Sequence, residues 1–158
     1  MESVRTAEDD DRPRLLELSE ELVTALSSQR GGELLLGPLS GKAAGAELGE
    51  RLVALLGRTD ALVLLGALDE VVVGVAVSVI EEDRRHERRG RFAGCFVEEG
   101  ARGVGVGRLL LDGSLTWMAE HGCTGVDGLA LPGDRTAKGF FESAGFKARL
   151  LTMHRPLG

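Results

Sequence analysis

The sequence predicts a single domain of the α/β (α+β) class, in which helices cover one central sheet. Its 158 residues are the size of one domain and enough to bury a core without disulfides or metal. In some segments apolar residues recur at helical spacing, and in others they form short continuous runs rich in Val and Leu, which are typical of strands. Glycine-containing or charged turns separate these segments. We therefore expect one domain over residues 1–158, with the element order β-α-α-β-β-β-α-β-α-β.

The first third of the chain predicts one short strand and two helices. Ser3 to Thr6 is a candidate strand, and a helix follows the acidic run after it and ends near Arg30, before two glycines. The segment from Glu33 to Gly41 is loop-like, and Ala43 to Leu56 resumes helical spacing.

A strand pair and a charged hairpin occupy the middle of the chain. Ala61 to Leu68 and Val71 to Ile80 are rich in Val and Leu and meet at Asp69-Glu70, which also splits the run into pieces too short to span a membrane. The charged segment from Glu81 to Arg89 is expected to be a solvated tip, because its mixed signs cancel. Phe92 to Val97 then forms the next strand.

A glycine-rich turn joins this strand to a helix from Gly105 to Glu120. The turn reads Arg102-Gly103-Val104-Gly105-Val106-Gly107-Arg108. The first turn of a helix presents unpaired N–H groups at the positive end of its dipole, which favours phosphate. Glycines allow an anion to approach the backbone, and the two arginines add positive charge. We therefore expect an anion site here.

Two other phosphate-binding patterns do not fit the chain. The nucleotide loop GxxxxGK[ST] is absent, since Gly41-Lys42 is followed by Ala43. The dinucleotide pattern GxGxxG fails because Arg108 stands at the third glycine position. A nicotinamide-dependent oxidoreductase is therefore a disfavoured alternative.

Two signatures lie in the second half of the chain. The first is Arg102-x-x-Gly105-x-Gly107. The second is Asp134-x-x-Ala137-x-x-Phe140-Phe141-x-x-x-Gly145-Phe146, which spans a predicted helix from Asp134 to Ser143 between strands at Thr124 to Leu131 and Phe146 to His154. In this order and spacing they resemble the GNAT superfamily of N-acetyltransferases, which use acetyl-CoA.

The resemblance implies a mixed, mostly antiparallel sheet with about four flanking helices and one parallel pair of strands that splay apart. These strands would be Phe92 to Val97 and Thr124 to Leu131. The backbone of Phe96 and Val97 would pair with the pantetheine arm, and the turn would hold the pyrophosphate through Arg102, Gly103, Val104, Gly105, Val106, Gly107 and Arg108. Asp134 stands where the family often has an Asn that touches the pantetheine.

The family's usual general acid is a Tyr, and this chain contains no Tyr. Phe141 takes that position, where its ring would line the pocket beside the thiol. Three routes stay open: another residue or water protonates the thiolate, the thiolate leaves unaided, or the protein binds CoA without transfer.

Glu98 and Asp127 are the candidate general bases. Glu98 follows the pantetheine-pairing residues at the end of a strand, and its alternative role is that of an ordinary strand-end carboxylate. Asp127 lies within an otherwise apolar strand, where a carboxylate needs a partner or solvent. Cys95 is expected to be a buried structural thiol, and the three histidines lack metal-ligand spacing, so no metal is predicted.

The expected function is therefore transfer of an acetyl group from acetyl-CoA to an amine by direct attack. The alternative is a non-catalytic CoA-binding regulatory module of the same fold. The partner is an amine-bearing small molecule or peptide; a net charge of −6 argues against nucleic acid, and no membrane segment is predicted. The acidic first 20 residues do not form a secretory leader, which predicts a cytoplasmic location. Assembly into a homodimer is left open.

Overall fold

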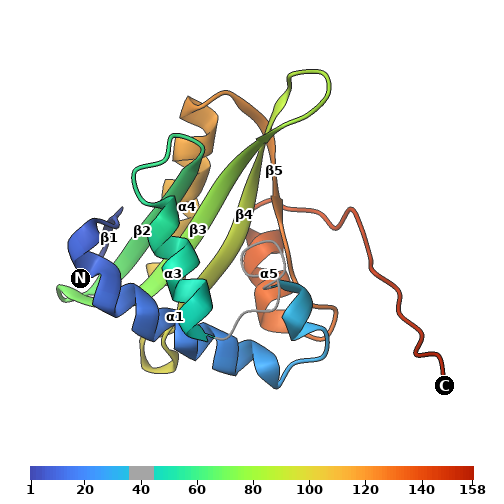
Figure 1. The fold of residues 1–158 in the computed structure, drawn as a ribbon, viewed down its shortest axis with the longest axis horizontal. Coiled ribbons are helices and arrows are strands. Elements are labelled where there is room, and N and C mark those ends of the chain that lie inside the picture. The colour runs from blue at the N-terminus through green and yellow to red at the C-terminus, as the bar shows by residue number, and fades with distance from the viewer. Residues whose placement is uncertain (36–44) are drawn as a thin grey trace.

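A computed structural model of the chain describes residues 1–35 and 45–158, and these form one five-stranded sheet with helices on both faces (Figure 1). The strands lie in the order β1 (Glu2–Thr6), β2 (Ala61–Leu68), β3 (Val71–Glu82), β4 (Arg88–Val97) and β5 (Cys123–Gly128). Neighbouring strands are antiparallel except β4 and β5, which are parallel. The predicted mixed, mostly antiparallel sheet is thus confirmed.

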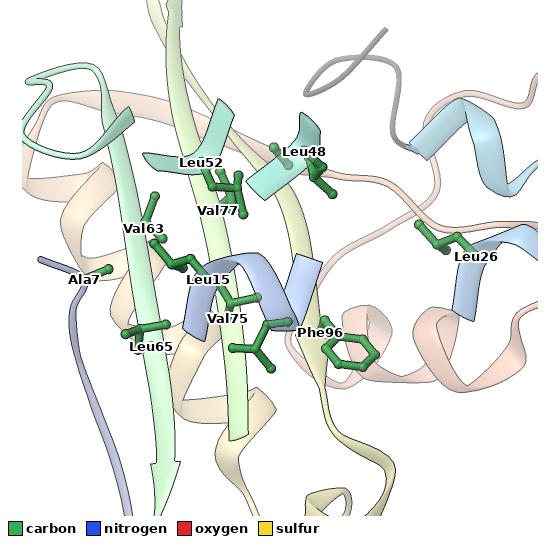
Figure 2. Packing of buried hydrophobic residues seen from close by; sticks show 12 residues of the cluster. Ala7, Leu15, Leu26, Leu48, Leu52, Val63, Leu65, Val75, Val77 and Phe96 are labelled. Carbon is green, nitrogen blue, oxygen red and sulfur yellow. The ribbon is translucent and has the colours of Figure 1, made fainter. Parts of the chain in front are cut away.

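The helices divide the interior into two cores. Helices α1 (Arg12–Ser27) and α3 (Gly45–Leu55) pack on one face, where Leu15, Val75 and Phe96 belong to one buried cluster (Figure 2). Helices α4 (Val106–Glu120) and α5 (Arg135–Ser143) cover the other face, where Phe92 and Leu110 belong to the second cluster. Alternate residues of β2 supply the two clusters, with Leu62 and Leu64 in the second and Val63 and Leu65 in the first, because successive side chains of a strand point to opposite faces.

Most predicted elements are confirmed, with small shifts at their ends. The charged hairpin tip is shorter than predicted, since β3 extends to Glu82 and β4 begins at Arg88, and the residues between them are exposed. Residues 32–35 are helical rather than loop-like. The rest of the predicted loop, including Gly37-Pro38, and the first two residues of the next predicted helix lie outside the described residues.

Strand β5 ends at Gly128, three residues earlier than predicted. After Gly128 the chain leaves the sheet, and Leu131 is buried at only 7% exposure. The Leu131 side chain lies beside Gly31, where an added Cβ would be 3.5 Å from it. Packing against the region after α1 therefore replaces further pairing with β4.

The predicted strand from Phe146 to His154 was wrong, because the structure has no regular element after α5. A strand needs a neighbour to pair with, and residues 146–158 pair with no other strand in the described part of the chain. Phe146 still packs against the second core and Arg149 contacts Asp127, and the chain after them extends away from the domain as an open segment (Figure 1). The segment has residues that favour a strand, but this propensity does not provide a second strand with which it can pair.

Candidate functional site

Strands β4 and β5 separate to form a fork. Their parallel pairing begins at Arg88 and Cys123 and ends where Phe92 lies opposite Gly128. Strand β4 continues for five more residues, to Val97, and remains paired with β3 on its other side. The splayed pair predicted from the family resemblance is confirmed, and one edge of β4 beyond Phe92 is left without a strand partner among the described residues.

The backbone of β4 can be oriented at the open end of this fork. The amide of Glu98 donates to the carbonyl of Val73 on β3 at 2.9 Å. Because a C=O and the following N–H point in opposite directions across a trans peptide, the Val97 carbonyl faces the fork. There it accepts a hydrogen bond from Arg102 Nε at 2.8 Å. The carbonyl of Phe96 points the other way, toward β3, where a Cβ added at Gly74 would be 3.0 Å from it.

The glycine turn takes the chain from the open end of the fork into α4. Gly103 and Gly105 have φ of +79° and +99°, a left-handed conformation that side chains other than glycine rarely adopt. Gly105 is the N-cap of α4, and Leu109 makes the first intrahelical bond back to it at 3.0 Å. The amides of the first helical turn are therefore free to bind an anion.

The two arginines of the turn have partners within the protein. The Arg102 guanidinium lies 5.8 Å from the centre of the Phe96 ring, in addition to its bond with Val97. Arg108 Nε donates to Asp112 at 2.9 Å, one helical turn further along α4, and both side chains are half exposed. The guanidinium of Arg102 thus stays beside β4, whereas that of Arg108 lies along the helix.

An aromatic cluster lies where the two strands of the fork part. The ring of Phe141, on α5, is 6.1 Å from Phe92, 5.5 Å from Phe140 and 5.1 Å from Phe146. Gly128 provides the space for this ring, since a Cβ at Gly128 would be 2.4 Å from it. The residue that replaces the family's Tyr therefore packs at the base of the fork and brings no hydroxyl there.

Asp134 is the N-cap of α5. Its carboxylate accepts a hydrogen bond from the amide of Ala137 at 2.9 Å. Asn and Asp both serve as N-caps, so the helix itself explains why either residue is suitable at this position.

Glu98 is part of an ion-pair group with α1. Arg14 Nη2 lies 2.5 Å from Glu98 Oε1, and the same guanidinium donates to the Val72 carbonyl and to Glu17 at 2.8 Å each. Partial desolvation, followed by the negative charge of Glu98, raises the pKa of Glu21. Glu98 therefore lies between a cation and another carboxylate, and its strand-end position is accounted for by this contact with α1.

Beside this group, α1 and the start of the glycine turn enclose an open pocket of about 560 Å³. Four of its eight lining residues are glutamates and one is an arginine, so its charge is negative; the residues are Glu17, Glu20, Glu21, Thr24, Ala25, Phe96, Glu99 and Arg102. Our sequence reasoning did not identify the α1 carboxylates. Their i, i+3, i+4 spacing, which places them on one helix face, was the available signal.

Asp127 lies at the closed end of the fork. It is opposite Arg91 in the parallel register, and Arg149 Nε is 3.6 Å from its carboxylate. Glu98 follows the last residue of β4 and is seven residues after Arg91, which corresponds to about 23 Å along an extended chain. The structure therefore does not bring the two candidate bases together.

The thiol of Cys95 is predicted to be unreactive. It is partly buried against the second core, and desolvation there raises its pKa to about 12. Because only the thiolate is nucleophilic, alkylation at pH 8 is expected to be roughly a thousandfold slower than for an ordinary thiol. Mass spectrometry after iodoacetamide treatment measures this. Modification of Cys95 in the folded protein as fast as that of a free thiol such as glutathione would contradict the raised pKa.

In residues 1–35 and 45–158, no group of three His, Cys, Asp or Glu side chains converges as metal ligands would. No described helix combines the length and the apolar character that crossing a membrane requires.

Comparisons with known proteins agree with this arrangement. The model of the acetyltransferase (GNAT) family matches residues 33–146. No curated protein sequence matches the chain. Among solved structures, a mutant of the BH1408 protein from Bacillus halodurans has a TM-score of 0.79 at 20% identity, and the match covers 98% of this chain and 99% of that one.

One further solved structure is an acetyltransferase by name, and another contains a CoA analogue. An aminoglycoside acetyltransferase from an uncultured soil metagenomic sample, in complex with sisomicin, has a TM-score of 0.72 at 17% identity over 99% of this chain and 97% of that one. AAC(6')-Iy in complex with a CoA bisubstrate analogue has a TM-score of 0.73 at 16% identity over 99% of both chains. At these identities the likeness shows a shared fold. Because the family model matches most of the sequence, this chain belongs to the acetyltransferase (GNAT) family.

Proposed function

We propose that the protein is an N-acetyltransferase that moves an acetyl group from acetyl-CoA to an amine by direct attack. In this reaction the amine nitrogen bonds to the thioester carbonyl carbon, the C–S bond breaks, and the thiolate leaves. The observation that carries the proposal is the continuity of the fork with the glycine turn. An unpaired stretch of β4 leads directly to free helix amides, so an extended ligand with a diphosphate group can lie along both.

Several residues fit such a ligand. A Cβ built at Gly103 meets nothing within 4 Å, so the turn is open. The first-turn amides from Gly105 to Arg108 would bind the pyrophosphate, and Arg108 would add charge after leaving Asp112. The fork-facing backbone of Val97 would pair with an amide of the pantetheine arm, in exchange for its bond to Arg102.

The acidic pocket is suited to the amine acceptor. Carboxylates on α1 and at Glu99 would attract a cationic amine and raise its local concentration. Direct attack requires a neutral nitrogen, so a proton must leave the ammonium group. Glu98, between Arg14 and Glu21, remains our proposed acceptor of that proton, directly or through water. Asp127 is the second candidate, although its contact with Arg149 supplies a structural role.

The alternative function is CoA binding without turnover. It is favoured by one observation, the aromatic cluster around Phe141. Phenyl rings occupy the position where the family has the Tyr hydroxyl that protonates the leaving thiolate. Under the N-acetyltransferase proposal, water or the acidity of the thiol itself serves instead.

The release of free thiol from acetyl-CoA, measured against a panel of mono-, di- and polyamines, tests the proposal. We expect release that depends on the amine, and a fall in kcat of about 100-fold for Glu98→Gln, which removes the carboxylate but keeps a hydrogen-bond acceptor for Arg14. Glu120→Gln, an exposed change at the end of α4, is the control. CoA binding without thiol release for any amine would favour the regulatory module.

Charge in the pocket is tested with the same assay. Glu21→Gln is expected to raise KM for a dicationic acceptor by about tenfold, because one attractive charge is lost, with little change in kcat. The effect should shrink as salt is added, since salt screens exposed charges. An equal KM for wild type and variant at low salt would place the acceptor outside this pocket.

A further inference from the structure

We propose that Arg14 is a positioning residue, which holds the carboxylate of Glu98 at the place where the acceptor amine loses its proton. The inference rests on the proposed N-acetyltransferase function, in which Glu98 accepts that proton. It adds to the site a residue of α1 that stands 84 positions before Glu98 in the chain.

The anchor for Arg14 is a β-bulge between β2 and β3. Val72 and Gly74 face consecutive residues of β2, so Val73 between them is an extra residue. A bulge interrupts the ladder of hydrogen bonds and leaves backbone groups available to other partners. Helix α1 crosses β3 on this face of the sheet (Figure 1). The Val72 carbonyl accepts hydrogen bonds from Arg14 Nε at 3.0 Å and from Nη2 at 2.8 Å.

The same bulge fixes both the backbone and the side chain of Glu98. The amide of Glu98 donates to the Val73 carbonyl at 2.9 Å. Its carboxylate lies 2.5 Å from Arg14 Nη2, the atom that also binds the Val72 carbonyl. A guanidinium is planar and its donors keep fixed directions, so a guanidinium bound to the backbone leaves a carboxylate partner little freedom. Arg14 therefore sets where the Glu98 carboxylate lies.

The surrounding charges require a cation at this point. Glu17 lies 2.8 Å from Arg14 Nη1, and the negative charge of Glu98 contributes, after desolvation, to the raised pKa of Glu21. Three carboxylates therefore gather beside the acidic pocket. Without Arg14 they would repel one another, and the Glu98 side chain would turn away. The side chains of Arg14 and Glu98 are 26% and 29% exposed, so solvent screens this pair less than a surface pair.

Steady-state kinetics on wild type, Arg14→Gln, Glu98→Gln and the double variant test the inference. We expect Arg14→Gln to lower kcat by about 30-fold, because a displaced base is a poor proton acceptor. KM for acetyl-CoA should change by no more than about twofold, because the glycine turn is untouched. In the Glu98→Gln background the same change should lower kcat by no more than about twofold further, since no base is left to position.

Two further variants separate positioning from folding. Arg14→Lys keeps the positive charge but lacks the planar fork, so kcat should fall only about fivefold. This smaller loss should also vanish in the Glu98→Gln background, which keeps the test valid even if Arg14→Gln does not fold. Arg12→Gln, also on α1, removes an ion pair with Glu50 on α3 and should leave kcat unchanged. Thermal unfolding shows whether each variant is folded.

The outcomes separate this inference from the function on which it rests. Wild-type turnover with an unchanged kcat in folded Arg14→Gln would overturn the positioning role and leave the acetyltransferase proposal intact. Equal losses of kcat with and without the Glu98 carboxylate would also overturn it, since Arg14 would then support the fold alone. If wild type releases no thiol with any amine, the acetyltransferase proposal is refuted, and the positioning role with it.

Discussion

Replacing Gly105 with glutamate is expected to abolish CoA binding while the domain still folds. At φ of +99° a side chain costs about 1 kcal/mol of stability, which a domain tolerates. Sterically the change is mild, because a Cβ there meets only Glu2 Cγ, at 3.9 Å. The new carboxylate would lie at the amides proposed to bind the diphosphate, so we expect at least about a 100-fold loss of affinity.

Two control variants separate charge from backbone strain. Gly100→Glu adds the same charge nearby, at a glycine whose Cβ would meet nothing within 4 Å and whose φ is not positive. It should bind CoA nearly normally. Gly105→Ala introduces the strain without the charge and should reduce affinity only slightly. Calorimetric titration with CoA measures the affinity, and thermal unfolding measures the stability of each variant. Unchanged CoA affinity in folded Gly105→Glu would refute the phosphate site.

The second large effect is expected at the base of the fork. In Gly128→Ala the new methyl group would lie 2.4 Å from the Phe141 ring, which has rings on several sides and cannot withdraw freely. Overpacking of this kind costs about 1–3 kcal/mol. We also expect weaker CoA binding, because a displaced ring would move into the space between β4 and β5.

A double-mutant cycle identifies the contact responsible. Phe141→Ala removes the ring, so Gly128→Ala should cost almost no stability in that background. The coupling energy between the two changes should therefore equal the 1–3 kcal/mol cost of Gly128→Ala in wild type, to within about 0.5 kcal/mol. Chemical denaturation of the four proteins measures it. Additive effects of the two changes would mean that Gly128 does not accommodate this ring. Gly139→Ala, at a helical glycine whose Cβ would be in open space, controls for the glycine change itself.

The parts of the site that sequence reasoning predicted well depend on local pattern. The glycine turn, the start of α4 and the cap at Asp134 each involve residues within a few positions of one another. Backbone geometry at such places is set by the residue types themselves. The fork, in contrast, followed from a family resemblance, since nothing local in Phe92 or Gly128 indicates where two strands part.

The parts that were missed depend on contacts between distant residues. Arg14 and Glu98 are 84 positions apart, so no spacing rule brings them together. The acidic pocket likewise needs α1 beside the glycine turn. The predicted strand from Phe146 to His154 was wrong for the same reason. Strand propensity depends on one segment, whereas pairing also depends on a second segment that lies beside it.

The fork has one consequence for the kinetics of the resting protein. Successive backbone amides of β4 point alternately toward β3 and away from it, so beyond Phe92 every second amide lacks a strand partner. Hydrogen–deuterium exchange should therefore be slow and fast by turns along a single strand, because only paired amides are protected. A ligand that pairs with β4 would protect the fast-exchanging amides as well. The exchange rates of the five residues after Phe92 therefore measure how much of the protein has ligand bound.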